Sequence, residues 1–221
     1  MSGRDSILGT IRQGLGRGEL GDGAKAELEA RISGHARGPR PSRVDLDADG
    51  LADLFVEYSK GVDVSVDRVA SLEDVPDRVA DYLTRENLPA TLRVAPEPSL
   101  DGIPWERRPT LTVTKGKTDG TDEVGLTAAF AGIAETGTLM MRSGPEHPTT
   151  LNFLPDSHVV VLRKSQIVGS YEDAWDRIRA GKMPRTVNFI TGPSRTGDIE
   201  QTIFMGAHGP RRLHIVLVED V

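Results

Sequence analysis

The sequence predicts an α/β protein in which helices flank a layered, mostly parallel β-sheet. Segments with the spacing of amphipathic helices alternate along the chain with short β-like runs, as is typical of α/β folds. Two runs, 159–162 and 215–218, are apolar on both faces, as expected of strands covered by helices on both sides. With 221 residues, of which 37% are hydrophobic, the chain can build a real core, and this excludes disorder throughout.

The first 45 residues differ from the rest and are predicted to form a helical N-terminal arm and linker. Apolar residues recur there at helical spacing, at Ile7, Leu8, Ile11 and Leu15, and a second, weaker helix follows. Glycines interrupt the stretch between the two helices, and Gly, Pro and Arg collect over 34–43. We expect the arm to pack poorly alone and to dock on the body, on a second copy of the chain in a homo-oligomer, or on a partner.

The body, residues 46–221, is predicted to be a single α/β domain. Helical spacing predicts a helix that ends near Gly61, a helix opened by Ser71 with Asp74 at the capping-box position, and helices at 170–180 and from about Asp198. β-like patterns predict strands at 62–66, 91–95, 110–115, 138–142, 157–163, 186–191 and 213–219. The run 125–134 is also β-like, although its alanines leave a helix open.

The composition excludes several classes of protein and partner. The 27 basic and 33 acidic residues give a net charge of −6, which argues against a nucleic-acid partner. Because the chain has no cysteine, it cannot hold a disulfide, a thiolate-bound zinc or an iron–sulfur cluster through thiolates. The apolar runs are too short for a membrane span and the start does not resemble a signal peptide, so we expect a cytoplasmic protein.

The five histidines are scattered, with no pair at helical metal-binding spacing, so no metal site is predicted. His147 and His208 lie in loops rich in Gly and Pro, where a solvated side chain is the simplest expectation. The G-x-G-x-x-G stretch at 16–21 lacks the preceding strand that a dinucleotide site needs, and it is interpreted as a flexible linker.

The first segment that can carry chemistry places small polar residues and one carboxylate between two β-like runs, at Glu135, Thr136, Gly137 and Thr138. Glu135 is a candidate nucleophile, general base or acceptor for a ligand hydroxyl, and Gly137 lets the backbone approach a ligand closely. The structural alternative, weighed equally, makes Glu135 a buried partner of Arg142 or Arg195 while the threonines close a bulge.

The second segment runs from an apolar strand through a turn into the helix expected at Asp198, and its candidates are Ser194, Arg195, Thr196, Gly197 and Asp198. Backbone N–H groups at a helix start, together with hydroxyls and a guanidinium, form a natural site for a carboxylate or phosphate. The structural alternative is a capped helix whose acidic first turn pairs with Arg195.

A loop before the last predicted strand adds His208, Arg211 and Arg212. The two arginines can complete the positive side of an anion pocket, or they can be solvated loop charges. We predict that His208 and Arg211 contribute to ligand binding, with a small anion held between the Glu135 loop and the turn at Ser194.

Together, the runs 134–138, 191–200 and 206–214 resemble the lactate utilization protein C family, which carries the LUD domain. They occur in the family's order with acceptable spacing, and the resemblance covers the chain from about residue 50 to the end. One departure is Gly197, where alanine is expected before the aspartate.

This resemblance implies a fold related to that of ribose-5-phosphate isomerase, CoA transferases and 5-formyltetrahydrofolate cyclo-ligase. It also implies a role in oxidising L-lactate to pyruvate beside two companion proteins, one or both of which carry iron–sulfur clusters. No cofactor is expected in this chain itself; the iron–sulfur clusters are expected only in the partners, because a chain without cysteine cannot ligate them through thiolates.

Three functional hypotheses follow from these patterns and this resemblance. The leading one is a component of a lactate-oxidising system that binds a small carboxylate or a phosphate-bearing ligand at the two segments above. The second is an acyl-transfer enzyme of the CoA-transferase type that uses Glu135 as its catalytic nucleophile, an idea that rests on fold analogy alone. The third is a scaffold that holds iron–sulfur partners through its arm. Whether the chain is itself an enzyme therefore stays open at this point.

Overall fold

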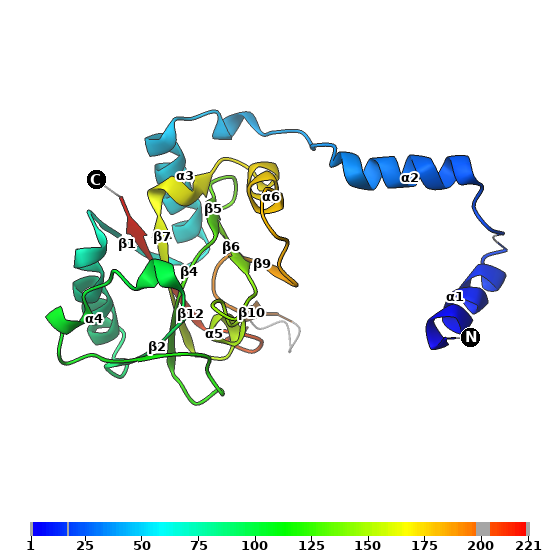
Figure 1. The fold of residues 1–221 in the computed structure, drawn as a ribbon. Helices are drawn as coiled ribbons and strands as arrows, with labels where there is room; N and C mark the ends of the chain where they lie inside the picture. Colours follow the sequence, from blue (N-terminus) through cyan, green and yellow to red (C-terminus); the bar gives the residue numbers. More distant parts are fainter. Residues whose placement is uncertain (1, 17, 198–203, 220–221) are drawn as a thin grey trace. The chain divides into compact units, whose positions relative to one another are not determined.

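The computed structural model describes residues 2–16, 18–197 and 204–219, and it divides the chain into two units, Met1–Pro39 and Arg40–Val221 (Figure 1). The first unit holds helices α1 (Gly3–Gly14) and α2 (Asp22–Gly34), and no residue of either helix is buried. Ser2 caps α1 through a capping box with Asp5, so this helix begins earlier than the apolar spacing indicated. The two predicted arm helices are therefore both present.

The division falls before residue 45, because the segment 40–45 is fastened to the second unit. Arg40 forms an ion pair with Asp173, with Nη1 3.0 Å from Oδ2. Val44 is fully buried, and Arg43 donates to the backbone oxygen of Glu135 over 3.2 Å. The last part of the predicted linker is thus part of the body.

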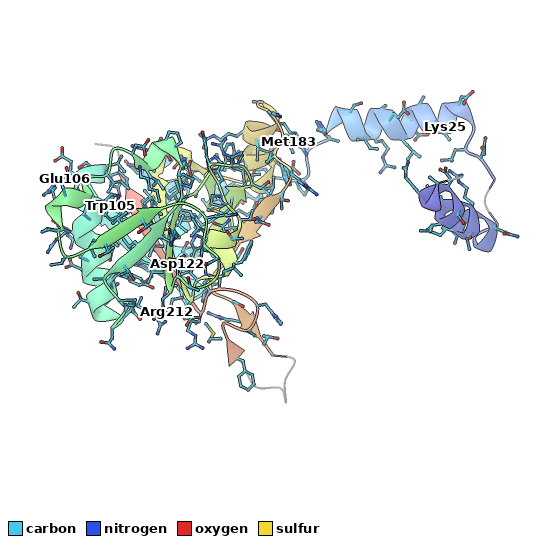
Figure 2. All side chains as sticks on the ribbon, turned by 60° about the horizontal axis from the view of Figure 1, so that its bottom comes forward. Lys25, Trp105, Glu106, Asp122, Met183 and Arg212 are labelled. Carbon is cyan, nitrogen blue, oxygen red and sulfur yellow. The ribbon has the colours of Figure 1, made fainter. Side chains whose placement is uncertain are left out.

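The centre of the second unit is a six-stranded sheet in the order β1-β12-β7-β4-β2-β3. Every neighbouring pair is parallel, which confirms the mostly parallel sheet expected from the sequence. The strands are β1 (Ser65–Val69), β2 (Thr91–Val94), β3 (Thr112–Lys115), β4 (Val124–Ala128), β7 (Ser157–Arg163) and β12 (Arg212–Val218). Figure 2 shows Asp122, just before β4, and Arg212, at the start of β12, toward the same end of this sheet.

A second sheet has the order β8-β5-β6-β9, and two of its three pairs are antiparallel. Its strands are β5 (Ala131–Ile133), β6 (Thr138–Arg142), β8 (Ile167–Val168) and β9 (Val187–Ile190). The β-like run 125–134 is therefore two strands that belong to different sheets, and a helix is not formed there. A short hairpin of β10 (Arg195–Thr196) and β11 (Phe204–Met205) completes the strands described.

The body has four layers, which Figure 1 shows in order. Helix α4 (Val75–Arg85) covers one face of the parallel sheet and closes a core that includes Tyr82, Leu92 and Val159. Helix α3 (Ala48–Gly61) and the second sheet cover the other face, around Phe55, Leu139 and Ile215. Helix α6 (Tyr171–Arg179) packs on the outer side of the second sheet. One face of the parallel sheet is thus covered by a sheet as well as a helix.

Several element boundaries differ from the sequence-based expectation. Ser71 caps a 3₁₀ turn (Leu72–Asp74) rather than an α-helix, and α4 begins only at Val75. The strand expected at Val62 begins at Ser65, because Val62 ends α3 and Asp63 adopts a left-handed φ of 61°. The expected helix from Asp198 lies outside the described residues. The remaining short elements are α5 (Thr150–Phe153) and 3₁₀ turns at Ser42–Val44, Pro98–Leu100, Trp105–Arg107 and Lys164–Gln166.

In the described part of the chain, none of the helices combines the length and the apolar character needed to cross a bilayer.

Gly137 sets how closely the β5–β6 loop approaches α3. Its φ is +65°, and a Cβ added there would lie 2.5 Å from the backbone nitrogen of Ser59 and 2.8 Å from the carbonyl carbon of Tyr58. The Ser59 hydroxyl donates to the Gly137 oxygen over 3.3 Å, which holds the contact. The glycine therefore allows the loop to meet a helix.

We expect Gly137→Ala to lower the free energy of unfolding by about 3 kcal/mol, because the left-handed φ alone costs about 1–2 kcal/mol and the backbone clash adds to it. The measurement is urea unfolding of the full chain. Gly61→Ala is the matched control, since nothing lies within 4 Å of a Cβ at that position. Equal midpoints for the two variants would contradict this account of the loop.

Candidate functional site

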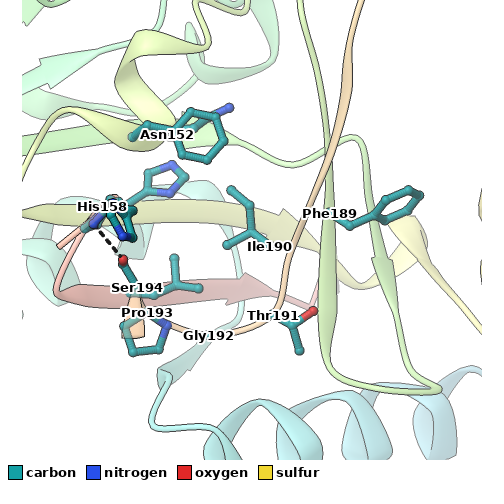
Figure 3. Close-up of a pocket in the computed structure, with 13 residues that line it drawn as sticks. Asn152, His158, Phe189, Ile190, Thr191, Gly192, Pro193 and Ser194 are labelled. Carbon is teal, nitrogen blue, oxygen red and sulfur yellow. Dashed lines mark hydrogen bonds between the residues drawn. The ribbon is translucent and has the colours of Figure 1, made fainter. Parts of the chain in front are cut away.

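A pocket of about 180 Å³ lies where the amino ends of β7 and β12 meet the turn that follows β9 (Figure 3). We call it the His158 pocket. Apolar side chains form much of its wall, among them Phe153, Ile190 and Leu213. Five polar residues also line it: Asn152, His158, Thr191, Ser194 and His208. An apolar pocket with a few convergent polar groups is the usual form of a small-molecule site.

His158 is the most unusual residue of this pocket. It is the second residue of β7 and is fully buried on the sheet face that carries α3 and the second sheet. Its Nε2 lies 2.8 Å from the hydroxyl oxygen of Thr127, whereas Nδ1 has no hydrogen-bond partner among the described residues. Leaving such a buried group unpaired costs about 1–3 kcal/mol, so a pocket beside it points to a polar ligand atom.

Burial lowers the pKa of His158 to about 3, so the ring is neutral at pH 7. A neutral imidazole carries one proton, so one nitrogen donates and the other accepts. If Nε2 accepts from the Thr127 hydroxyl, Nδ1 carries an N–H; if Nε2 donates, Nδ1 carries a lone pair. In either tautomer, Nδ1 is one hydrogen-bonding group without a partner among the described residues.

Ser194 and His208 reach the pocket because two loops are bonded to each other. The Ser194 backbone nitrogen donates to the Pro210 oxygen over 2.8 Å, and the Gly206 nitrogen donates to the Ser194 oxygen over 2.9 Å. The His208 nitrogen donates to the Ser194 Oγ over 3.2 Å, the dashed line in Figure 3. The loop 206–210 and the turn 191–194 therefore form one wall of the pocket.

Glu135 does not share this pocket. Its Oε1 lies 3.7 Å from Nη2 of Arg43, and its Oε2 accepts from the backbone nitrogen of Tyr171 over 3.4 Å. Tyr171 is the first residue of α6, so the carboxylate lies at a helix N-terminus, where negative charge is stabilised. The ion-pair partner of Glu135 is thus Arg43. The structural alternative, which named Arg142 or Arg195 as this partner, is wrong.

Thr136 and Thr138 belong to a partly buried hydroxyl network. Their Oγ1 atoms are 2.7 Å apart, and both lie within 3.0 Å of the Tyr171 hydroxyl. Thr138 also lies 2.7 Å from the Oγ1 of Thr191, which lines the His158 pocket. These hydrogen bonds connect the Glu135 loop to the pocket wall without placing Glu135 in the pocket.

Arg195 points away from the His158 pocket. Its Nη2 donates to the Val62 oxygen over 2.9 Å and pairs with the Asp63 carboxylate. Thr196 is buried in the β10–β11 hairpin and Gly197 is exposed, while Asp198 lies outside the described residues. Because Arg195 and Thr196 form a strand, the turn at Ser194 does not lead directly into a helix, and Nη2 of Arg195 is bonded to residues 62 and 63.

Arg211 lines a separate cavity of about 180 Å³ beside Tyr82 and Glu86. Pro193 and Leu213 line both this cavity and the His158 pocket, and so form the wall between them. Of the residues predicted from the sequence, Ser194 and His208 therefore meet in one pocket, and Glu135, Arg195 and Arg211 have other surroundings.

Sequence reasoning missed Asn152 and His158. His158 lies in a run that was interpreted only as a buried strand. The available signal was a histidine among five neighbouring apolar or small residues, because a buried imidazole needs hydrogen-bond partners. The expectation of a solvated His147 is wrong: its side chain is 14% exposed and lies 2.9 Å from the Glu97 carboxylate.

Comparisons with known proteins agree with this fold. The chain is 35% identical over 97 residues to the lactate utilization protein C of Anoxybacillus flavithermus, a match that covers 44% of each chain. It is 34% identical over 102 residues to the protein of that name from Bacillus subtilis, covering 44% of this chain and 42% of the relative. The matched stretch thus spans less than half the length of these relatives.

Among solved structures, a DUF162 family protein from Deinococcus radiodurans superposes with a TM-score of 0.57. The two are 23% identical, and the match covers 78% of this chain and 99% of the other, so it shows a shared fold. The family model of the LUD domain matches residues 53–218, which is most of the body described above. The chain belongs to the LUD domain family.

Proposed function

We propose that this chain works in lactate utilization by binding a small carboxylate, of the size of lactate or pyruvate, in the His158 pocket. The pathway is supported by the relatives that carry lactate utilization in their names. The observation that carries the binding proposal is the Nδ1 atom of His158, which is buried and has no partner in the described chain, on a residue that lines the pocket.

The walls of the pocket match the two halves of such a ligand. Phe153, Ile190 and Leu213 offer apolar contacts to a short carbon chain. A carboxylate withdrawn from water needs several hydrogen-bond donors. The side chains of Asn152 and Ser194, and the Nδ1–H tautomer of His158, can supply them. A 2-hydroxy or 2-oxo oxygen gives the ligand a second polar atom for His208 or Thr191.

The acyl-transfer alternative is less well supported by the contacts. It requires the Glu135 carboxylate to face a substrate, whereas its two oxygens face Arg43 and the Tyr171 N–H. A phosphate-bearing ligand in this pocket is also disfavoured, because Arg195 is engaged by Asp63 and Val62. We therefore assign the pocket to a monocarboxylate.

The oxidation of lactate to pyruvate releases two electrons, and this chain holds no thiolate-bound cluster to accept them because it has no cysteine. We propose that companion iron–sulfur proteins accept them, as the family resemblance implies. The first unit, whose helices have no buried residue, is then a candidate surface for holding those companions. In this scheme the chain binds the small carboxylate and its partners carry the redox chemistry.

Isothermal titration of the full chain tests the binding proposal. We expect heat with L-lactate or pyruvate, and a loss of affinity of about tenfold or more in His158→Phe, which keeps the ring shape but removes both nitrogens. The matched control is His35→Phe, the same change at an exposed residue, which should bind as the unaltered chain does. The proposal would be wrong if neither ligand bound to the unaltered chain, or if His158→Phe bound a ligand as tightly as the unaltered chain does.

The same variant tests the protonation state of the histidine. Below about pH 6.5 the unfolded chain binds a proton at His158, while the folded chain does so only near its pKa of about 3. This residue's contribution to stability is therefore complete above pH 6.5 and is lost as the pH falls from 6.5 toward 3, by at most about 1.4 kcal/mol per pH unit.

We expect urea unfolding between pH 7 and pH 4.5 to show a shallower loss of stability in His158→Phe than in the unaltered chain. His35→Phe should follow the unaltered chain, since His35 is exposed. Parallel pH dependence in all three proteins would mean that His158 is not held in its neutral form by burial.

A further inference from the structure

A second candidate site lies in a broad groove of about 770 Å³ between the loops 142–147 and 182–185. The second loop follows α6 and carries Met183, labelled in Figure 2. Hydrogen bonds tie the two loops together: the Ser143 nitrogen donates to the Thr186 oxygen over 3.0 Å, and the Thr186 nitrogen donates to the Ser143 Oγ over 2.9 Å. The groove is therefore part of the folded body.

Positive charge gathers in this groove, although the chain as a whole carries a net charge of −6. Arg142, Lys182 and Arg185 line it, against the single acidic residue Glu146. Within the described residues, no carboxylate lies within ion-pair distance of any of the three cations. Unpaired cations that share one groove attract an anion with more than one negative charge.

Arg142 is held in place by two hydrogen bonds in series, the first exposed and the second partly buried. Its Nε donates to the Nε2 of His147 over 2.9 Å, and the Nδ1 of His147 lies 2.9 Å from the Oε2 of Glu97. Because an arginine can only donate, Nε2 is the acceptor and Nδ1 carries the proton donated to Glu97. Glu97 is only 9% exposed, so a buried carboxylate fixes the ring and the ring fixes the guanidinium.

Neither terminal nitrogen of Arg142 has a hydrogen-bond partner in the part of the chain that the structure describes, so both can bind a ligand. The guanidinium carbon lies 5.3 Å from the centre of the Phe130 ring, which supports its flat face. A small cavity beside Arg142 and His147 is also lined by Ala95 and Ala128, at the carboxyl ends of β2 and β4. That edge is where open α/β sheets bind their ligands.

We propose that this groove binds a phosphate group through Arg142, Lys182 and Arg185, and that Glu97 and His147 are positioning residues for Arg142. A fixed arginine fork suits two oxygens of a phosphate, and the two flanking cations balance its second charge. The phosphate can be free inorganic phosphate or part of a small phosphorylated molecule. The site is separate from the His158 pocket and does not depend on the function proposed for it.

The test is isothermal titration of the full chain at low ionic strength with two probes, inorganic phosphate and glycerol phosphate. We expect binding of at least one probe, weakened about tenfold or more by Arg142→Ala and by Lys182→Ala. Lys60→Ala is the matched control, because it removes one exposed charge elsewhere on the body. Tighter binding of glycerol phosphate would identify a phosphorylated molecule as the ligand, and tighter binding of phosphate the free ion.

The positioning role is tested with two changes at one residue. His147→Gln keeps a donor for Glu97 and an acceptor for Arg142, so it should stay within about threefold of the unaltered chain, whereas His147→Ala should bind like Arg142→Ala. Thermal unfolding confirms that each variant is folded, and His158→Phe should bind phosphate normally. No binding of either probe, or equal binding by Arg142→Ala and Lys60→Ala, would overturn the proposal.

Discussion

Two glycines that lie against the end of α3 set how closely two loops approach this helix. Gly137 and Gly192 have φ values of +65° and +90°, and a Cβ on either would lie within 2.8 Å of backbone atoms at Ser59 or Val62. Their close approach brings the β5–β6 loop and the turn after β9 to the same helix end. The 2.7 Å contact between the Thr138 and Thr191 hydroxyls then joins the two segments and sets one wall of the His158 pocket.

The two candidate sites use buried polar groups in different ways. In the His158 pocket, the ring has one partner, Thr127, and its second nitrogen is buried without a partner among the described residues. In the groove, both nitrogens of His147 are engaged, so that histidine can only position Arg142. A neutral hydrogen-bonding group suits a monocarboxylate, and a fixed cation with two neighbours suits a phosphate. In our two proposals, the same residue type therefore serves two kinds of anion recognition.

Local patterns predicted the elements well and the site only in part. The strands 138–142 and 157–163 have the predicted bounds, because apolar alternation depends on neighbours in sequence. Periodicity does not say which sheet a strand joins, and the run 125–134 divides between two sheets. Polar turn residues mark loops but not their partners, so Arg195 meets Asp63 rather than Glu135. The unpaired nitrogen of His158 depends on contacts that only the tertiary structure creates.

The central claim is that a small carboxylate completes the hydrogen bonding of His158. The most direct measurement is ¹⁵N NMR of the histidine rings, assigned by the signals that disappear in His158→Phe, with and without L-lactate or pyruvate. The account predicts that ligand addition changes the chemical shift of Nδ1 strongly. The chemical shift of Nε2 should change little, because Nε2 keeps its hydrogen bond to Thr127. Unchanged His158 signals at saturating concentrations of both ligands would contradict it.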